Sequence, residues 1–332
     1  MERKLASIRK VENVIPIEGA DMIEVSVVGG WKVVTKKGEF KPGDLAIYCE
    51  VDSFLPIKEE FEFLRKSSYK KMGKQEGFRL KTIKLRGQLS QGLLLPASQE
   101  ILSLYKEGED VSEILGIVKY EPPIPAELAG KVKGMFPSFL RKTDEERIQN
   151  LTENYNEWKE KEFYVTEKLD GSSATYYLKD GEFGVCSRNL ELLETEGNTF
   201  WKVARELDLE NKLRETGRNI SIQGELVGEG IQGNPYKIKG QTVYFFNAFG
   251  IDIQQYYSQK EMENLIQSLN LKTVPILDRN YTLPETVEDL LQYADSKSEL
   301  NKDFGREGVV VRSLDRSISF KVISNNFLLK EK

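Results

Sequence analysis

The sequence has 332 residues, 39% of them hydrophobic and 30% charged, which is the composition of folded domains rather than of a disordered chain. It contains no histidine, which excludes Ser-His-Asp and Cys-His nucleophile systems and removes the commonest transition-metal ligand. Its two cysteines, Cys49 and Cys186, are too few for a disulfide framework. No apolar run reaches transmembrane length, and the first ten residues lack the apolar stretch of a signal peptide, so we expect a cytoplasmic protein without membrane contact.

The net charge of −5 is unevenly distributed along the chain. Residues 65–86 contain nine basic side chains and one acidic one, a local charge of +8 that leaves −13 for the rest. Such a run is usually a solvated surface, but it is also the kind of surface that contacts a phosphate backbone.

The length predicts two domains, because single domains usually have about 100–200 residues. Residues 1–100 are predicted to form short strands rich in β-branched residues, in the segments 6–17, 23–29, 31–38 and 44–56. Pairs such as Gly29-Gly30 and Pro42-Gly43 separate these strands as turns, and the pattern favours a small closed barrel of the OB or SH3 kind. Residues 101–132, which include Pro122, Pro123 and Pro125, have the composition of a linker before a second domain at 133–332.

The second domain is predicted to mix strands and helices. A capping box from Thr143 to Glu146 indicates a helix through Arg147, Ile148 and Leu151. The turn at Lys179–Glu182 reverses the chain between two strands. Strands are predicted at 162–169, 172–178, 183–188, 219–227, 242–253, 308–314 and 317–324, and helices at about 195–215, 258–269 and 285–295. Because these elements do not alternate as regular βαβ units, we expect an α+β domain with largely antiparallel sheets.

The segment from Glu167 to Gly171 ends an apolar strand and holds the first residues that indicate chemistry. A lysine nucleophile such as Lys168 must lose a proton, which burial, a neighbouring cation or a divalent metal ion favours. In an extended chain Asp170 shares a face with Lys168 and can help to hold such an ion, and Gly171 lets a phosphate approach the backbone. Alone, the motif is more often an exposed turn with a solvated lysine.

Three later segments place charged residues within or beside apolar strands. Glu225 lies in a strand bounded by glycines, Glu307 precedes the apolar residues 308–311, and Lys321 has apolar neighbours. Each alone is consistent with a structural salt bridge, because charges in such strands are rarely buried without a partner. Structure alone does not readily account for all four motifs in this order.

In this order the motifs resemble those of the covalent nucleotidyltransferases, which comprise RNA ligases, DNA ligases and mRNA capping enzymes. The matching segments are Lys168–Gly171, Ser187-Arg188-Asn189, Gly224-Glu225, Phe245–Phe249, Glu307–Val310 and Phe320-Lys321. The segments Phe136–Phe139 and Lys142–Asn150 are similar to the lead-in of RNA ligases.

Domain order narrows the resemblance. DNA ligases and capping enzymes carry an OB domain after the transferase domain, whereas eleven residues follow Lys321 here and the barrel-like segment comes first. The chain therefore resembles the RNA ligase clade with an amino-terminal OB domain. This implies an α+β fold with a small OB-like RNA-binding barrel at 1–100, a linker, and an adenylyltransferase domain at 133–332 with antiparallel sheets and flanking helices.

What the resemblance implies is an ATP-dependent RNA ligase that seals 3′-OH and 5′-phosphate ends in RNA repair. Lys168 would attack the α-phosphorus of ATP to give lysyl-AMP, the AMP would pass to the RNA 5′-phosphate, and the 3′-OH would displace it. Asp170, Glu225 and Glu307 would hold Mg²⁺ or Mn²⁺, mostly through waters, because Mg²⁺ sheds its waters reluctantly. The implied partner is RNA, at ends or nicks, and we expect a monomer.

The resemblance also implies the contacts of the nucleotide and of the RNA. Glu167 would contact the adenine edge, and Phe246 and Val310 would sandwich the ring, with Phe245 and Phe249 as competitors of Phe246. Further nucleotide contacts would come from Leu169, from Glu225 at the ribose, from Arg188 at the ribose or RNA end, from Lys321 at the α-phosphate and from Arg147 at the departing pyrophosphate. The RNA backbone would contact Lys70, Lys71, Lys74, Arg79, Lys81, Lys84 and Arg86.

One position departs from the family pattern, and some alternatives stay open. The last motif often reads lysine, any residue, lysine, whereas here Ile323 follows Lys321, which leaves the second phosphate contact open, with Lys330 as a weak candidate. A DNA ligase or GTP-using capping enzyme is disfavoured by domain order, and an inactive nucleic-acid-binding protein by the intact motifs. The sequence does not distinguish a nicked duplex from a single-strand break or a tRNA-like fragment, nor does it show whether a DNA template strand is accepted.

Overall fold

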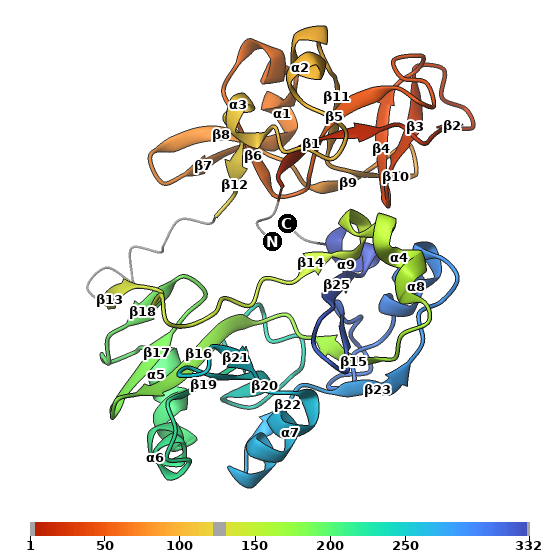
Figure 1. Cartoon of the computed structure of the whole chain (residues 1–332). Helices are drawn as coiled ribbons and strands as arrows, with labels where there is room; N and C mark the ends of the chain where they lie inside the picture. Colours follow the sequence, from red (N-terminus) through yellow and green to blue (C-terminus); the bar gives the residue numbers. More distant parts are fainter. Residues whose placement is uncertain (1–3, 122–130, 331–332) are drawn as a thin grey trace. The chain divides into compact units, whose positions relative to one another are not determined.

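The computed structural model describes residues 4–121 and 131–330, and the chain divides into two compact units (Figure 1). The amino-terminal unit comprises Met1–Ile124 and Ile148–Asn154, and the carboxy-terminal unit comprises Pro125–Arg147 and Tyr155–Lys332. The short segment Ile148–Asn154 is attached to the first unit by Trp31, whose Nε1 donates to Asn150 Oδ1 at 2.7 Å.

Short strands make up most of the amino-terminal unit, as predicted. They are β1 (Ala6–Lys10), β2 (Asn13–Pro16), β3 (Ile23–Val28), β4 (Trp31–Lys36), β5 (Leu45–Cys49), β6 (Ser53–Pro56), β7 (Tyr69–Met72), β8 (Gln75–Arg79), β9 (Thr82–Leu85), β10 (Gln88–Gln91), β11 (Leu93–Pro96) and β12 (Val118–Lys119). They pair in the orders β1-β5-β11, β2-β3-β4, β10-β9 and β12-β6-β8-β7, and η1 (Glu59–Leu64) and α1 (Arg65–Ser68) lie between β6 and β7. In β4 the buried residues are Trp31, Val33 and Thr35, which is the alternation of a strand with one face on a core.

The segment predicted as a linker is in part folded. It contains α2 (Gln99–Leu104), which Ser98 caps by accepting from the Ile101 N–H, as well as α3 (Ser112–Leu115) and β12, which pairs with β6. Residues 101–119 therefore belong to the amino-terminal unit, because Val111 and Ile117 are buried in its core. The three prolines that suggested a linker lie outside the described residues.

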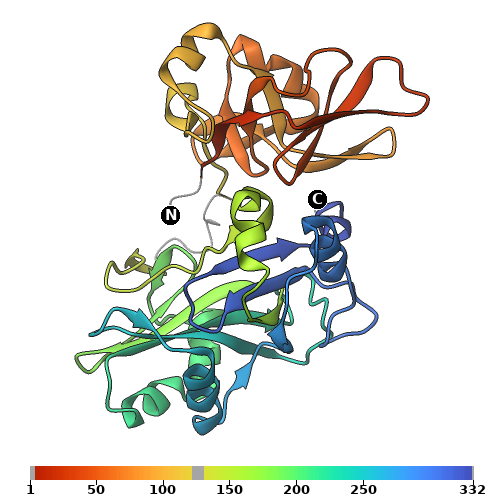
Figure 2. The ribbon, with the colours of Figure 1, turned by 45° about the vertical axis from the view of Figure 1, so that its right-hand side comes forward.

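Two sheets form the frame of the carboxy-terminal unit (Figures 1 and 2). The larger has the order β13-β18-β17-β16-β19-β20-β21, with β22 also paired to β20, and the smaller has the order β14-β25-β24-β15-β23. Of these strand pairs, only β14–β25 and β20–β22 are parallel within the described residues, which confirms the predicted antiparallel character. The larger sheet contains β13 (Val132–Met135), β16 (Ser172–Lys179), β17 (Glu182–Cys186), β18 (Leu190–Leu192), β19 (Ile220–Gly228), β20 (Gln241–Gly250), β21 (Gln255–Tyr256) and β22 (Lys272–Thr273). The smaller contains β14 (Glu146–Arg147), β15 (Phe163–Lys168), β23 (Ile276–Tyr281), β24 (Gly308–Ser313) and β25 (Ser319–Ile323).

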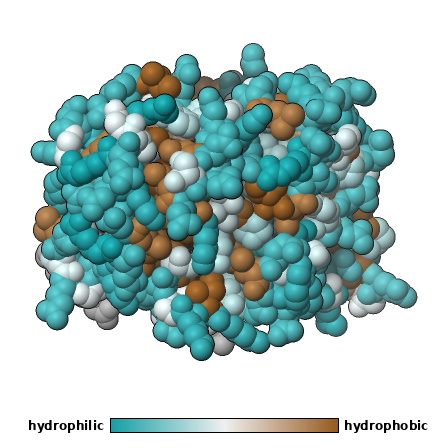
Figure 3. Space-filling view, turned by 90° about the horizontal axis from the view of Figure 1, so that it is seen from below, coloured by the Kyte–Doolittle hydropathy of each residue, from teal (hydrophilic) through white to brown (hydrophobic). Residues whose placement is uncertain are grey.

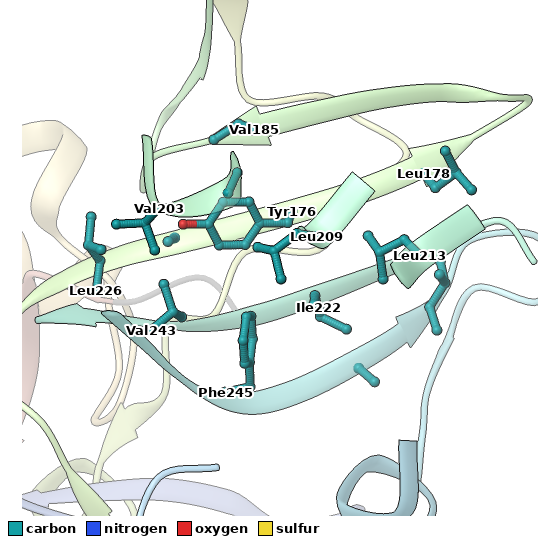
Figure 4. Close-up of a cluster of buried hydrophobic side chains, with 14 of the residues drawn as sticks. Tyr176, Leu178, Val185, Val203, Leu209, Leu213, Ile222, Leu226, Val243 and Phe245 are labelled. Atoms are coloured by element: carbon teal, nitrogen blue, oxygen red, sulfur yellow. The ribbon is translucent and has the colours of Figure 1, made fainter. Parts of the chain in front are cut away.

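Several helices follow residue 148, and two of them, α5 and α6, pack on one face of the larger sheet. These helices are η3 (Ile148–Asn150), α4 (Thr152–Trp158), α5 (Thr199–Glu206), α6 (Leu209–Glu215), α7 (Gln259–Ser268), α8 (Val287–Ala294) and α9 (Asn325–Leu328). Side chains of α5 and α6 such as Val203, Leu209 and Leu213 meet Tyr176 of β16 and Phe245 of β20 in a buried cluster (Figure 4). Burying each large apolar side chain stabilises the fold by about 1.5–3 kcal/mol. This core holds β16 and β19, the strands that flank the candidate site.

Two predicted helices differ from those observed. The segment from Thr143 to Leu151 does not form the predicted α-helix, because Glu146 and Arg147 lie in β14, which pairs in parallel with β25. Only the short 3-10 helix η3 follows within the segment, and α4 begins at Thr152. The predicted helix at 195–215 is two helices, α5 and α6, separated at Asp208, whose φ of +55° is left-handed. The helix predicted at 258–269 is confirmed as α7, which opens with a capping box, since Ser258 and Glu261 bond each other's backbone N–H groups.

The surface is mainly hydrophilic on the face shown in Figure 3, where hydrophobic residues form small patches interrupted by polar ones. This agrees with the high charged fraction of the chain. Among the described residues, the longest helix, α7, has ten residues, and no helix is long and apolar enough to cross a membrane.

Candidate active site

Lys168 lies where the chain passes from one sheet of the carboxy-terminal unit to the other. It is the last residue of β15 in the smaller sheet, and β16 in the larger sheet begins four residues later. Leu169 between them is 2% exposed and anchors the connection in an apolar cluster. Gly171 has no room for a side chain, because a Cβ there would lie 2.9 Å from Glu225 Cγ. The two sheets therefore fix the backbone from which the side chains of Lys168 and Asp170 extend; we call residues 168–171 the junction.

Two carboxylates from other strands reach the junction. Lys168 pairs with Gly308 at the start of β24, so the preceding Glu307 lies beside it, and its Oε1 is 2.7 Å from Lys168 Nζ. Glu225 of β19 lies on the other side, where its carboxylate accepts a hydrogen bond from the Gly171 N–H. Three of the four motifs, those of Lys168, Glu225 and Glu307, thus place one lysine among three acidic side chains, since Asp170 also acts on the Lys168 charge.

The close approach of these groups affects the pKa of Lys168 and of Glu225. Burial lowers the pKa of Lys168, but attraction to Glu307, Glu225 and Asp170 outweighs burial, and the pKa is raised overall. Burial also raises the pKa of Glu225 to about 8, with Lys168 opposing the shift and the two other carboxylates adding to it. Lys168 is therefore an ammonium at neutral pH in this state, and it needs further positive charge nearby to become a nucleophile.

The side chains at the junction suit a hard divalent cation. Three carboxyl groups, those of Asp170, Glu225 and Glu307, surround Lys168, and oxygen is the ligand atom that Mg²⁺ and Mn²⁺ prefer. Over the described ranges, no three histidine, cysteine, aspartate or glutamate side chains are grouped closely enough to ligate a metal ion directly. The arrangement therefore fits an ion that is held chiefly through water molecules.

Glu167 offers an acceptor that the protein does not use. Glu167 is only 1% exposed. Its Oε2 accepts from the Glu299 N–H at 2.8 Å, and its Oε1 is buried without a hydrogen-bond partner among the described residues. Burial raises the pKa of Glu167, and hydrogen bonds from Ser298 and from the Glu299 N–H partly offset this rise. A buried acceptor of this kind fits a ligand that brings an N–H donor, such as an amino-substituted base.

A bulge in β20 decides which phenylalanine faces the junction. Phe245 and Asn247 pair with consecutive residues of β19, which leaves Phe246 as the extra residue. Phe246 packs beside the cluster that contains Leu169, whereas Phe245 lies in the core of the larger sheet and Phe249 in a third cluster. Phe246 is therefore the ring on the same side as the junction.

The smaller sheet places three further predicted residues in one row. Lys321 of β25 pairs with Val310 of β24 on one side and with Arg147 of β14 on the other. Residues directly opposite in register share a face of the sheet, so two basic side chains and one apolar one line up there. Val310 and Arg147 are 9% and 6% exposed, and Lys321 is half-buried. An apolar surface beside two cations suits a flat base attached to phosphates.

Three other positions considered in the sequence analysis lie in different surroundings. Arg188 is half-exposed and is paired with Asp144 at 2.8 Å. Ile323 pairs with Gly308 and is only 4% exposed, so it fills a place in the core of the smaller sheet. Lys330 is exposed after α9, and no contact joins it to the junction among the described residues.

Six of the seven predicted RNA-binding residues lie on two hairpins of the amino-terminal unit, β7–β8 and β9–β10, and Lys81 lies between these hairpins. Their surroundings differ. Arg79 and Lys71 are engaged by Asp52 at 2.7 Å and Glu76 at 2.9 Å. Lys70, Lys74, Lys84 and Arg86 are exposed, and the described part of the chain gives them no ion pair; Lys81 is half-buried and has partners within the protein.

Sequence reasoning missed two features near these residues. Arg312, two residues after Val310, is 2% exposed and forms two hydrogen bonds with Glu145 Oε1, at 2.6 and 3.1 Å. The sequence signal that could have identified Arg312 is a charged residue in an apolar strand, and the same kind of signal identified Glu307. The other is Tyr236, in the loop between β19 and β20, whose hydroxyl accepts a hydrogen bond from the Asp170 N–H. Nothing in the composition of that loop indicated this contact.

Comparisons with known proteins follow the same division of the chain. An OB-fold domain family matches residues 5–97, which confirms the predicted OB-like barrel, and an RNA ligase family matches residues 161–326. A search among curated proteins found no significant match.

Solved structures of an RNA ligase from Naegleria gruberi are similar to the whole chain. A variant without ligand is 47% identical with a TM-score of 0.92, and the alignment covers 99% of this chain and 98% of that one. A variant with ATP and Mn is 46% identical with a TM-score of 0.92, and the ligase with PPi is 47% identical with a TM-score of 0.92. Each of these two alignments covers 99% of both chains.

Proposed function

Because this chain is an enzyme of the RNA ligase family, we propose that it uses ATP to seal 3′-OH and 5′-phosphate ends of RNA through an adenylate on Lys168. The observation that carries the proposal is the position of Lys168 at the junction, 2.7 Å from Glu307 and within the influence of Glu225 and Asp170. The Naegleria ligase structures with ATP and Mn, with AMP and Mn, and with PPi hold the ligands that such a reaction requires.

The first step is nucleotidyl transfer to the lysine. The neutral Nζ of Lys168 attacks the α-phosphorus of ATP, a P–N bond forms, the bond to the β-phosphate oxygen breaks, and pyrophosphate leaves while Nζ loses its proton. In the free protein Lys168 is held as an ammonium by Glu307, so this step requires that the carboxylate charge be offset. A divalent metal ion held by Asp170, Glu225 and Glu307 through waters would supply that positive charge and neutralise the phosphates.

The surrounding residues orient the nucleotide for in-line attack. The buried Oε1 of Glu167 accepts from the exocyclic amine of adenine, and Phe246 and Val310 hold the ring between them, beside Leu169. The row formed by Lys321 and Arg147 contacts the α-phosphate and the departing pyrophosphate. Positioning and charge neutralisation of this kind supply most of the catalysis in phosphoryl transfer.

Two further transfers complete the reaction. An oxygen of the RNA 5′-phosphate attacks the lysyl-AMP phosphorus, the P–N bond breaks, and Lys168 recovers a proton. The 3′-OH of the second end then attacks the 5′-phosphate, AMP leaves, and a phosphodiester forms. Arg188, which is half-exposed beside Asp144, contacts the ribose or the RNA end in these steps.

Intact mass spectrometry tests the first step. The protein is treated with pyrophosphate to remove bound AMP and then incubated with ATP and Mg²⁺ or Mn²⁺ without RNA. We expect a gain of one AMP on the wild type and on Lys179→Ala, whose lysine pairs with an exposed aspartate, but not on Lys168→Ala. No adduct on the wild type would overturn the proposal and favour an inactive RNA-binding protein, and an adduct with GTP alone would favour a capping-type enzyme.

The amino-terminal unit would bind the RNA backbone through its two basic hairpins. Its exposed cations, Lys70, Lys74, Lys84 and Arg86, are available to phosphates, whereas Arg79 and Lys71 are engaged by carboxylates. Changing Lys70 and Lys74 to alanine should weaken RNA binding severalfold at low salt and reduce the dependence of log K on log salt by about 0.7 per lost phosphate contact for single strands. The matched control is Lys36→Ala with Lys37→Ala, two exposed lysines of the same unit outside the hairpins.

A further inference from the structure

The backbone of the junction is held by hydrogen bonds with the loop between β19 and β20. The N–H of Asp170 donates to the hydroxyl of Tyr236 at 2.6 Å. Lys168 is the last residue of β15 to pair with β24, so Asp170 lies beyond the ladder of that sheet. The hydroxyl of Tyr236 thus accepts a hydrogen bond from the peptide N–H of Asp170, at the point where the chain passes from the smaller sheet to the larger one.

Tyr236 is itself rigidly placed. It is 4% exposed, it packs with Leu169 and Val227, and its ring meets Phe304 edge to face with centroids 6.2 Å apart. Burial raises the pKa of Tyr236, so the hydroxyl stays neutral at physiological pH. A buried aromatic ring with a polar tip is suited to delivering one hydrogen bond at a fixed position.

The loop of residues 229–240 that carries Tyr236 is braced along its length. Asn234 closes it internally, because its side chain both accepts from the Ile238 N–H and donates to the Ile238 carbonyl. Asn301 Nδ2 donates to the Pro235 carbonyl at 2.7 Å, which ties this loop to the segment whose Glu299 N–H bonds Glu167. The residues on both sides of Lys168 are therefore held by two loops that are joined to each other.

The same loop makes a second contact with the junction. Gln232 Nε2 donates to the Gly171 carbonyl at 3.3 Å. Together with the Tyr236 hydroxyl, this contact engages the peptide groups before and after the Asp170–Gly171 bond. Because these groups are held, the direction in which the Asp170 side chain leaves the backbone is restricted.

We propose that Tyr236 is a positioning residue, whose hydroxyl fixes the backbone at Asp170 and thereby aims the side chains of Lys168 and Asp170 for nucleotidyl transfer. This inference rests on the proposed role of Lys168. Tyr236 acts through the backbone and contacts neither the nucleotide nor a metal ion. Its hydroxyl matters for the rate of transfer more than for the binding of ATP, because the adenine contacts lie on other residues.

The decisive variant is Tyr236→Phe, which removes one oxygen and keeps the ring. Its matched control is Tyr176→Phe, another buried tyrosine of the same unit, whose hydroxyl lies 3.5 Å from the Phe200 carbonyl inside the core of Figure 4. We expect the rate of lysine adenylylation at saturating ATP to fall about tenfold in Tyr236→Phe, with less than a twofold change in the half-saturating ATP concentration. We also expect faster hydrogen–deuterium exchange in the peptide that contains Asp170, and neither change in Tyr176→Phe.

The outcomes separate this inference from the function on which it rests. A wild type that never forms the adduct defeats the proposed function, and the exchange measurement then still shows whether the Tyr236 hydroxyl holds Asp170. Unchanged exchange in Tyr236→Phe, or a loss of rate no greater than in Tyr176→Phe, overturns the positioning role. Should Tyr236→Phe fail to fold, Gln232→Ala takes its place, since that side chain is exposed, and a two- to threefold loss of rate with unchanged ATP saturation is the result expected.

Discussion

The charged side chains of the two units are organised in opposite ways. In the amino-terminal unit Lys70 and Lys74 extend into solvent, and among the described residues they have no ion pair. In the carboxy-terminal unit Lys168 is enclosed with Glu225 and Glu307, and the neighbouring charges affect the pKa of Lys168 and of Glu225. Exposed charges act separately and are screened by salt, whereas enclosed charges are strongly coupled and hardly screened. The first arrangement suits a polyanion of any sequence, and the second suits chemistry at one atom.

The largest effect should come from removing one member of the enclosed group. In Glu307→Gln the amide keeps the size of the side chain but removes the charge that lies 2.7 Å from Lys168. We expect lysine adenylylation to slow by about 100-fold, because in the proposed function this carboxylate helps to hold a metal ion and orients the nucleophile. The rate at which the AMP adduct forms in a single turnover measures this loss.

The control for this change is Glu206→Gln, which alters an exposed glutamate of α5 that lies 3.8 Å from Lys202. Its adduct should form at the wild-type rate. If Glu307→Gln stays within threefold of the wild type, the enclosed carboxylates are not coupled to the chemistry, and the contrast between the two units fails.

A second enclosed pair tests whether coupling also affects stability. Glu145 and Arg312 are joined by two hydrogen bonds, and Arg312 Nη1 is buried without a hydrogen-bond partner among the described residues. Glu145→Gln would leave the Arg312 charge uncompensated and should lower the free energy of unfolding by about 3 kcal/mol. Urea denaturation measures this, with Glu263→Gln, which weakens the surface pair with Arg279, as a control that should lose less than about 1 kcal/mol.

The same pair predicts a dependence on pH. Burial would raise the pKa of Glu145, but Arg312 and Ser319 outweigh it and hold the pKa below its usual value. The lowered folded pKa means that the stabilisation is complete above the unfolded pKa of about 4.3 and is lost as the pH falls through the folded value. The stability gap between wild type and Glu145→Gln should therefore be constant at neutral pH and shrink below about pH 4; a gap that stays constant at pH 3 would contradict the assignment.

Much of the site could be predicted because its residues are unusual in their local surroundings. Glu225, Glu307 and Lys321 are charges in apolar strands, and Lys168 and Asp170 share a glycine-terminated motif, so each is visible in a short stretch of sequence. Strand alternation and turn residues likewise made most strands predictable.

The parts that could not be predicted depend on contacts between distant segments. The capping box at Thr143 gave way to a strand, because β14 pairs with β25, more than 170 residues later in the chain. The resemblance named Phe246 rather than Phe245, but the bulge in β20 that turns Phe246 toward the junction is not visible in the sequence. Tyr236 lies in a loop of turn-forming residues, where no local pattern shows that its hydroxyl reaches Asp170.

The smallest effect is expected where an exposed cation already has a partner. Lys71 and Glu76 face each other across β7 and β8 with 2.9 Å between Nζ and Oε1, beside Lys70, which has no such partner among the described residues. Replacing Lys71 and Glu76 together by alanine leaves the net charge unchanged, so RNA affinity should change less than twofold and the salt dependence should stay the same. The Lys70→Ala and Lys74→Ala variant, with the same number of substitutions in the same hairpin, should lose affinity severalfold and bind with a shallower salt dependence. Equal losses in the two double variants would mean that the hairpin contacts RNA through its shape, and that pairing within the protein does not decide which lysines are available to phosphates.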